Sequence, residues 1–303
     1  MSSFGENWTF TGFGESHGAA VGGVLDGVPA GLHIDLNLIR EELDRRAGKG
    51  VVGASQRAQH EPDNVEWLSG VLDGVTLGTP IAFIIRNTNA RPEDYERFKH
   101  TYRVGHADKV YELKYGIRDW RGGGRASARE TAGRVVAGCI AKQQLAQQGI
   151  TIRAELIQVG EETDPARFAD TIAGYQKDGD SIGGIVECRI NGLPIGVGEP
   201  IFDKLQAHLA FAIMSINACK GFEYGTGFGG VTQAGSAINA ISGGISGGIS
   251  DGSEVVFRCV FKPTPSTPKA GVQGRHDACV AVRAVPVVEA MTALAIINLM
   301  KHE

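Results

Sequence analysis

Apolar positions along this chain follow two patterns, one typical of strands and one typical of helices, and segments of the two kinds alternate. Five runs rich in β-branched residues are typical of strands, namely Val21–Leu25, Ile81–Ile85, Ile150–Ile157, Gly184–Ile190 and Val255–Phe261. Four longer stretches have the spacing of helices, namely Leu36–Arg46, Ala126–Gln148, Asp203–Ile216 and Pro286–Met300. Asp35 is the expected N-cap of the first helix, and Pro286 is expected in the first turn of the last, where its missing N–H costs little.

These elements predict an α/β or α+β fold. No Gly-x-Gly-x-x-Gly motif follows a strand and opens a helix, so a Rossmann domain is not predicted. The chain has neither a low-complexity linker nor a block of like charge, and we expect one domain over residues 1–303. Two stretches, Gly122–Arg134 and Gly274–Met291, each combine a glycine turn, basic residues and a helix, which suggests two related halves.

Composition narrows the functional classes. Hydrophobic residues make up 42% of the chain, enough for a sizeable core, and the formal net charge of −4 does not favour nucleic acid. The apolar runs break before they reach membrane-spanning length, and the first residues do not resemble a signal peptide, so a cytoplasmic location is expected. Five cysteines without a CxxC pair predict reduced, mostly buried thiols and no metal site.

Glycine is the compositional outlier, with 43 residues. It clusters in short motifs, at Gly12–Gly14, Gly122–Gly124, Gly227–Gly230 and Gly243–Gly252. Ordinary turns would explain one such cluster. Several clusters, some beside charged residues, favour loops that approach a ligand closely.

Two histidines lie in such loops. His17 is flanked by small residues in Gly14–Gly18, and His106 follows Arg103 and precedes Asp108. Both are candidate general acids, and Asp108 could fix the tautomer of His106 or raise its pKa. The alternatives are a structural histidine in the first loop and a surface turn with an ordinary ion pair in the second.

The strongest pattern is the stretch Arg118–Thr131, in which three glycines lead into an alanine-rich helix. Four arginines surround the expected helix start, where the helix dipole disfavours positive charge. A plain helix cap explains Ser127 or Thr131 but not these arginines. The pattern therefore predicts a binding site for phosphate or carboxylate.

Three further motifs carry weaker signals. Gly274–Cys279 again places Arg, His and Asp before a helix, although a polar loop with an ordinary cap explains it equally well. Lys262–Ser266 is a prolyl loop with one cation and two hydroxyl groups. Asn217, in Met214–Gly221, is either a helix C-cap or an amide that faces a heterocycle.

The motifs together resemble the chorismate synthase family over nearly the whole chain. They are GESHG at 14–18, RxGHAD at 103–108, YGxRDxRGGGRxSARET at 115–131, MSINAxKG at 214–221, KPTPS at 262–266 and GRHDxCVxxRAVPxxEAM at 274–291. The resemblance implies a single-domain β-α-β sandwich, a homotetramer, and a lyase that converts 5-enolpyruvylshikimate 3-phosphate to chorismate and phosphate. It implies reduced FMN as cofactor without net redox change, and an external source of reduced flavin, with NADPH as a possible reductant.

The resemblance also implies roles for individual residues. His17 would protonate the departing phosphate, His106 would serve the reduced flavin as proton donor, and Asp277 would act through flavin N5 in proton removal at C6. The implied substrate-binding residues are Ser16, Arg46, Arg103, Arg129 and Arg275, with Arg46 also a weak NADP contact. The implied flavin-binding residues are Arg125, Ala126, Ser127, Asn217, Ala218, Gly247, Lys262, Pro263, Thr264, Pro265, Ser266 and Arg275.

The chain departs from the family pattern at several points. After Arg46 an expected arginine-rich stretch is replaced by Ala47–Gly53, so Lys49 or Arg57 would have to substitute. The segments from Gln148 to Ser181, before Gly243 and from Ser266 to Gly274 are short for the family. The alternative functions are a family member of low or no activity that still binds flavin or phosphate, and a non-catalytic anion-binding module. The two histidines and Asp277 argue against the second, because simple anion binding needs only the arginines.

Overall fold

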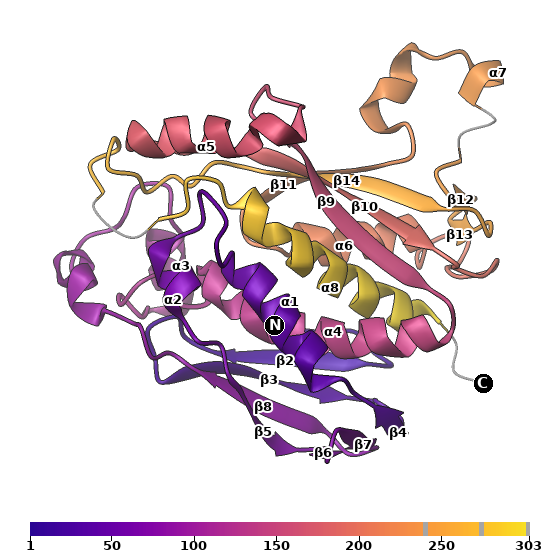
Figure 1. Cartoon of the computed structure of the whole chain (residues 1–303), viewed down its shortest axis with the longest axis horizontal. Helices are drawn as coiled ribbons and strands as arrows, with labels where there is room; N and C mark the ends of the chain where they lie inside the picture. The colour runs from indigo at the N-terminus through magenta and orange to yellow at the C-terminus, as the bar shows by residue number, and fades with distance from the viewer. Residues whose placement is uncertain (239–241, 273–275, 301–303) are drawn as a thin grey trace.

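Two antiparallel sheets enclose a layer of helices in this computed structural model, which describes residues 1–238, 242–272 and 276–300 (Figure 1). The first sheet has the order β1 (Ser3–Phe4), β2 (Thr9–Gly14), β3 (Ala20–Asp26), β8 (Ile81–Arg86) and β5 (Val65–Ser69). The second has the order β11 (Cys219–Tyr224), β14 (Val255–Phe261), β10 (Gly184–Asn191) and β9 (Thr151–Val159). This is the β-α-β sandwich that the sequence predicts.

The helices between the sheets are α1 (Leu36–Ala47), α4 (Thr131–Gln147), α6 (Leu205–Met214) and α8 (Ala281–Leu299). The smaller elements are α2 (Gln56–His60), α3 (Asp108–Tyr115), α5 (Phe168–Lys177), α7 (Gly235–Ile238), the sheet β4 (Ala30–His33), β7 (Val75–Leu77), β6 (Val71–Leu72), and the hairpin β12 (Ile245–Ser246), β13 (Ile249–Ser250). Short 3-10 turns cover 92–98, 124–126, 128–130, 165–167 and 227–232.

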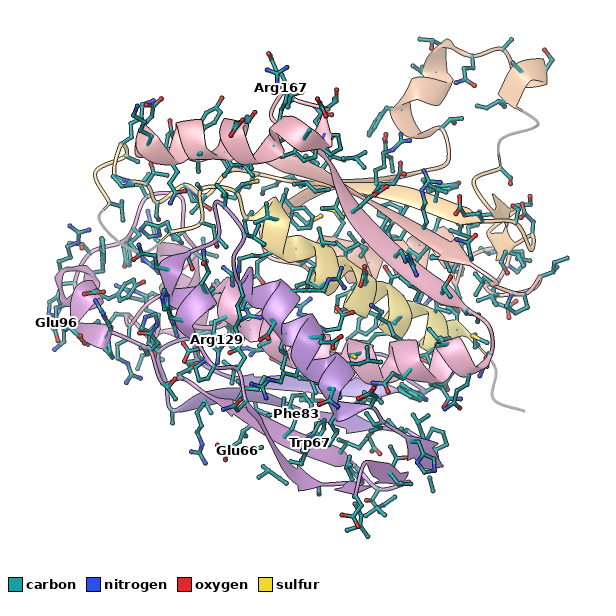
Figure 2. The ribbon with its side chains drawn as sticks, in the orientation of Figure 1. Glu66, Trp67, Phe83, Glu96, Arg129 and Arg167 are labelled. Carbon is teal, nitrogen blue, oxygen red and sulfur yellow. The ribbon has the colours of Figure 1, made fainter. Side chains whose placement is uncertain are left out.

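The alternation of apolar side chains orients both sheets. In β14 every second side chain, from Val255 to Phe261, is buried against the helices. On the first sheet Trp67 and Phe83 pack together with ring centroids 5.8 Å apart (Figure 2). The buried residues of both sheets and the helix layer form one cluster. A single domain over 1–303 stays a prediction, which this shared core supports.

Helix α8 is apolar on nearly every side because it lies between the two sheets. It is long and apolar enough to cross a membrane, but 78% of its apolar window is buried inside the protein, as in the core helix of a globular fold. It packs closely on α4, where a side chain at Gly138 would collide with the backbone of Ala290. All five cysteines are free and buried, as predicted.

The structure confirms all five predicted strands and corrects two helix starts. Asp35 caps α1, because its side chain accepts from the N–H groups of Asn37 and Leu38. Helix α4 begins at Thr131 instead of Ala126, since Ser127 is extended and separates two 3-10 turns.

The last helix begins at Ala281 instead of Pro286, so the expectation of a first-turn proline is wrong. The helix continues through Pro286 although the carbonyl of Val282 loses its i+4 donor there, and packing of the buried ring compensates. The beginnings of α4 and α8 lie at the same end of the helix layer as the end of α1 (Figure 1). The two similar sequence stretches therefore converge in space.

Candidate active site

A cavity of about 340 Å³ lies at this end of the helix layer. The turns before α4, the start of α8, the end of α1, helix α2 and four loops form its walls. The predicted site residues that line it are His17, Arg46, Arg103, His106, Ala126, Ser127, Arg129, Asn217, Ala218, Lys262, Pro263, Thr264, Pro265 and Asp277. Segments far apart in the sequence thus meet at one site.

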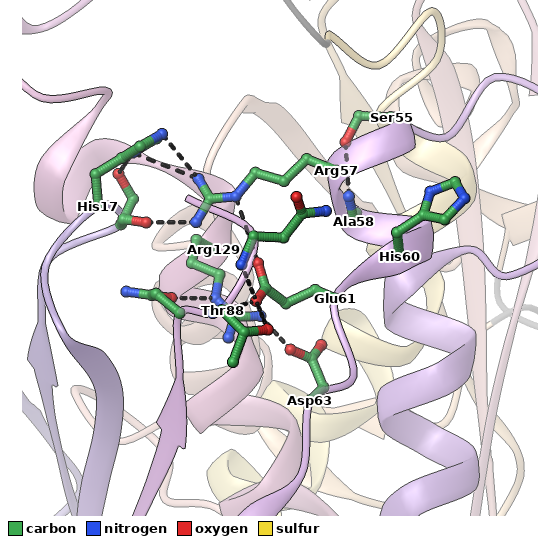
Figure 3. Close-up of polar contacts among 12 residues, drawn as sticks. His17, Ser55, Arg57, Ala58, His60, Glu61, Asp63, Thr88 and Arg129 are labelled. Carbon is green, nitrogen blue, oxygen red and sulfur yellow. Dashed lines mark hydrogen bonds and ion pairs between the residues drawn. The ribbon is translucent and has the colours of Figure 1, made fainter. Parts of the chain in front are cut away.

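His17 is buried in the cavity wall, with 6% of its surface exposed. Its Nδ1 is 3.0 Å from the hydroxyl of Ser16, so this predicted substrate residue lies behind the ring and orients it. The ring of Tyr95 packs edge-on against His17 at 4.7 Å. Arg57 lies on the other side, with Nη1 3.3 Å from Nε2, and donates from Nη2 to the carbonyl of Ser16 at 2.5 Å (Figure 3).

His106 is hydrogen-bonded through Nε2 to Ser266, which ties the RxGHAD loop to the KPTPS loop. Burial lowers the pKa of His106 to about 4, and nearby Arg103 lowers it further than Asp108 can offset. Asp108 does raise this pKa, as expected, but by less than burial and Arg103 lower it. The carboxylate of Asp108 binds the Arg103 guanidinium at 2.9 and 2.7 Å, so its charge is already compensated.

Arg46 and Arg129 share one buried carboxylate, that of Asp63. Arg46 donates from Nη2 to Asp63 Oδ2 at 2.6 Å, and Arg129 donates from Nη1 to Oδ1. Arg129 also donates from Nε to Asn87 at 2.8 Å and lies in the interior of the molecule (Figure 2). Asn87 in turn donates to the carbonyls of Glu15 and Gly18, which connects the arginines to the His17 loop.

Of the two residues that could substitute for the missing family arginine, only Arg57 lines the cavity. It lines the cavity from α2, whereas Lys49 pairs with Asp44 at 2.5 Å and is not in the cavity wall. Glu61 lies 3.5 Å from Arg57 Nε and accepts from the backbone N–H groups of Thr88 and Asn89 (Figure 3). The segment 61–63 therefore organises three arginines.

Asp277 faces the cavity from the loop before α8. Both of its carboxylate oxygens accept from Nη1 of Arg283, and Oδ1 also accepts from the N–H of Ser55 at 2.8 Å. Arg283 donates from Nε to the carbonyl of Arg46. The carboxylate is therefore held in one orientation by α8 and by the start of α2.

Asn217 presents an unused acceptor. Its Nδ2 donates to the carbonyl of Ala126 at 3.0 Å, while its buried Oδ1 has no hydrogen-bond partner among the described residues. The next residue, Ala218, has φ of 67°, a conformation that side-chain-bearing residues rarely adopt. Such a locally costly arrangement is typical of a ligand site. Asn217 is therefore an amide facing the cavity and not a simple helix cap.

The arginines of the glycine-rich stretch divide between several environments. Arg118 donates to Glu112 and to two carbonyls, and Arg121 pairs with Asp119. Arg125 donates to the carbonyls of Gly12 and Gly14 beside a neighbouring hollow and does not line the cavity. Only Arg129 of the four lines the cavity. The idea that four arginines converge on one anion is therefore wrong, because other segments supply their acceptors.

Gly247 and Arg275 are two further predicted flavin contacts. Gly247 is in the turn between β12 and β13 and does not line the cavity, and Arg275 lies outside the described residues. The predictions for Gly247 and Arg125 as flavin contacts stay predictions. Sequence reasoning did not assign Glu61, Asp63, Asn87, Tyr95 or Arg283 to the site. The only local signal was the Glu-Pro-Asp sequence after α2, which is common in ordinary turns.

The charge of the cavity identifies its ligand class. Six basic side chains and two carboxylates line it among the described residues: Arg46, Arg57, Arg103, Arg129, Lys262, Arg283, Glu61 and Asp277. Asp63 and Asp108, directly behind, compensate two of the cations. The start of α8 also directs its positive dipole end here, since Val280 and Arg283 line the cavity. The fold and site define an enzyme that acts on a small polyanionic molecule.

Comparison with known proteins identifies the family. The family model of chorismate synthase matches residues 8–300, and the chain belongs to this family. It is 46% identical to chorismate synthase of Christiangramia forsetii, over 97% of this chain and 95% of that one. It is 44% identical to that of Phocaeicola vulgatus, with 98% and 97% covered. A crystal structure of chorismate synthase superposes with a TM-score of 0.77 at 28% identity, covering 98% and 92%.

The protein is therefore a lyase of the shikimate pathway, which leads to the aromatic amino acids. The match with the Christiangramia forsetii protein extends over 341 aligned positions, more than the 303 residues of this chain. That relative consequently carries segments that this chain lacks. The expectation of a shortened family member is confirmed.

Proposed function

We propose that the cavity converts 5-enolpyruvylshikimate 3-phosphate to chorismate and inorganic phosphate by anti-1,4-elimination, with reduced FMN bound beside the substrate. The C3–oxygen bond breaks, the phosphate leaves with its electron pair, and a proton leaves C6, so the reaction involves no net redox change. The observation that carries the proposal is the convergence of His17, His106 and Asp277 on one cavity of excess positive charge.

The arginines are the proposed substrate-binding residues. Arg46 is 1% exposed, and its Nε and Nη1 have no hydrogen-bond partner among the described residues. A buried guanidinium with unused donors is costly unless an anion completes it. Arg46, Arg129 and Arg57 therefore form the proposed site for the phosphate and carboxylate groups, and bidentate recognition favours arginine here.

His17 is placed to protonate the departing phosphate. It lies beside Arg57, which would hold the phosphate while the proton is transferred. Donation by Ser16 to Nδ1 would leave the proton on Nε2. Asp277 would assist removal of the C6 proton through flavin N5, and Arg283 and the Ser55 N–H keep its carboxylate in place.

The described residues fit a flavin. The buried Oδ1 of Asn217 is an unused acceptor that a ring N–H would satisfy. Ala126, Ser127 and the KPTPS loop provide small and polar surface on the same side. Reduced FMN, when bound, supplies electron density to the breaking bond. His106 is neutral at pH 7 in the free protein, because burial and Arg103 lower its pKa to about 4, so it can accept a proton; it would act as a proton donor once a bound anion raises that pKa.

An external reductase is the proposed source of reduced flavin, with NADPH as the ultimate reductant. Arg46 is a weak candidate for an NADP contact, because its guanidinium is buried and shared with Asp63. We also propose a cytoplasmic location.

We propose a homotetramer, and the surface of α6 supports self-association. This helix is largely apolar, with Gln206 and His208 as its polar residues. Leu209 and Ile213 are buried, whereas Phe211 is 63% and Met214 47% exposed. Exposed apolar surface of this extent is typical of a protein interface. Light scattering at micromolar concentration should give a tetramer, and a monomer would contradict the proposal.

The function is tested by incubating the enzyme with substrate and chemically reduced FMN without oxygen, followed by chromatography of the products. Chorismate should form, and omission of FMN should abolish it. Saturable binding of substrate without product would favour the alternative of an inactive family member. Absence of both would support neither function.

A further inference from the structure

Asp63 joins two arginines that come from different helices of the helix layer or their adjoining turns. Its side chain is 1% exposed, and its two oxygens accept from Arg46 at the end of α1 and from Arg129 in the turn before α4. Asp63 does not itself line the cavity, whereas both arginines do. Its carboxylate is therefore a bridge behind the cavity wall.

The backbone at Asp63 is adapted to this bridge. Its φ is 47°, in the left-handed region, which aspartate and asparagine tolerate better than other side-chain-bearing residues. The neighbouring Glu61 fixes the same segment by accepting from Thr88 and Asn89. The position of the Asp63 carboxylate is thus determined by the chain and not by a flexible side chain.

The two arginines that Asp63 binds differ in how many of their guanidinium nitrogens have hydrogen-bond acceptors. Each guanidinium nitrogen of Arg129 has one acceptor, because Asp63, Asn87 and the carbonyl of Arg86 accept from Nη1, Nε and Nη2, which leaves one N–H of each terminal nitrogen for a ligand. Arg46 is engaged only through Nη2, and Nε and Nη1 have no partner among the described residues. Rotation of Arg46 about its long side chain would remove these donors from the cavity side, and the Asp63 bond prevents it.

We propose that Asp63 is a positioning residue, which holds the Arg46 guanidinium beside Arg129 with its unused donors available to an anionic group of the substrate. The inference rests on the proposed function for the identity of that substrate. The proposed role of Asp63 is in substrate affinity. Stability alone does not explain a buried ion pair at this position, because well-packed apolar residues can replace buried ion pairs without loss of stability.

Asp63→Asn tests this role, because asparagine keeps the size and the left-handed backbone but removes the charge and turns one acceptor into a donor. We expect KM for the enolpyruvyl substrate to rise by about tenfold or more, with a much smaller change in kcat, since the anion is bound both before and during bond cleavage. The melting temperature is expected to fall as well, so it does not decide the question. Asp44→Asn, which breaks an exposed pair with Lys49, is the matched control and should leave KM unchanged.

The pH dependence of substrate affinity distinguishes a positioning role from a purely structural one, because a structural role would leave it unchanged. The charged groups around Arg46 are Asp63, Arg129 and Arg283, and burial lowers the pKa of Arg46 to about 10, while Asp63 opposes that shift. Loss of the Asp63 charge lowers this pKa further. Affinity for substrate should therefore begin to fall at a lower pH in Asp63→Asn than in the wild type.

An anion-binding measurement separates this inference from the proposed function. Inorganic phosphate, titrated calorimetrically into the enzyme without flavin, should bind the wild type more tightly than Asp63→Asn. If the wild type lacks turnover but this difference is found, the proposed reaction fails and the positioning role stands. If the wild type turns over and Asp63→Asn has wild-type KM and pH dependence, the positioning role is overturned.

A second variant, Asp63→Glu, tests the proposal if Asp63→Asn does not fold. Asp63→Glu keeps the charge and displaces the carboxylate by one methylene, so it should also raise KM. Wild-type KM in Asp63→Glu, with Asp63→Asn unfolded, would show that the residue serves stability alone and would overturn the proposal.

Discussion

Arg283 donates from Nη1 to both carboxylate oxygens of Asp277, at 2.9 and 2.8 Å. The same arginine donates from Nε to the carbonyl of Arg46 at 2.9 Å. The proposed group for proton removal at C6 is thus fixed to the end of α1, which also carries a proposed substrate-binding arginine. Proton removal and substrate binding are connected through one side chain.

Asp277→Asn should abolish most of the turnover while retaining the fold. Asparagine keeps one acceptor for Arg283 but is not a base, so the bond-breaking step should slow by about 10²–10⁴-fold. Single-turnover phosphate release with saturating substrate measures this step, and thermal unfolding measures the fold. A variant with wild-type release would exclude Asp277 as the base.

His17→Ala and His106→Ala should each reduce turnover by about 10²–10⁴-fold, the usual effect of losing a positioned acid or base. His60→Ala is the matched control, since His60 is exposed on α2 and points away from the cavity (Figure 3). Turnover and melting temperature are measured on all three. If activity falls only in proportion to lost stability, both histidines are structural.

Ligand binding should raise the pKa of His106. Its pKa of about 4 in the free protein lies below the ordinary 6.5, so at pH values between the two the ring is neutral. A bound anion stabilises the protonated ring, which raises its pKa and draws one proton from the buffer. Calorimetry of FMN binding in buffers of different ionisation enthalpy measures that proton.

His106→Gln provides the control for proton uptake. Its FMN binding enthalpy should depend less on the buffer than that of the wild type. Equal dependence in the two proteins would mean that another group takes up the proton, and His106 would then have no electrostatic contact with the flavin.

The strand pattern was readable from the sequence because burial on one face gives each strand a period of two residues, as in β14. The start of α1 was also readable, since Asp35 carries a local N-capping signal. The starts of α4 and α8 were not, because Ser127 is extended between two 3-10 turns before α4, and because α8 begins before the buried Pro286 and continues through it.

Some residues of the candidate site could likewise be predicted from the sequence, and others could not. His17, His106 and Asp277 stand out because each lies in a polar loop near glycine. Asp63 does not, because the arginines that it binds are 17 and 66 positions away in sequence. Only the fold shows that one carboxylate meets both.

Packing between α4 and α8 should tolerate no side chain at Gly138. Gly138→Ala would press its methyl group against the backbone of Ala290 and should lower the free energy of unfolding by about 1–3 kcal/mol. Gly174→Ala is the matched control, because Gly174 is in α5 with open space around it. Alanine there should raise the free energy of unfolding by about 0.5–1 kcal/mol.

Urea denaturation of the two glycine variants provides the measurement. The two changes should have opposite signs. A Gly138→Ala protein as stable as the wild type would show that α4 and α8 can separate without cost, and that the cavity between their first turns is not rigid.

We propose that this cavity eliminates phosphate without consuming its flavin. Phosphate release is therefore measured without oxygen, with substrate in large excess over reduced FMN, while the flavin absorbance is recorded. Many equivalents of phosphate and chorismate should form for each flavin, and the flavin should still be reduced at the end. Release that stops after one equivalent per flavin, release accompanied by flavin oxidation, or no release would contradict it.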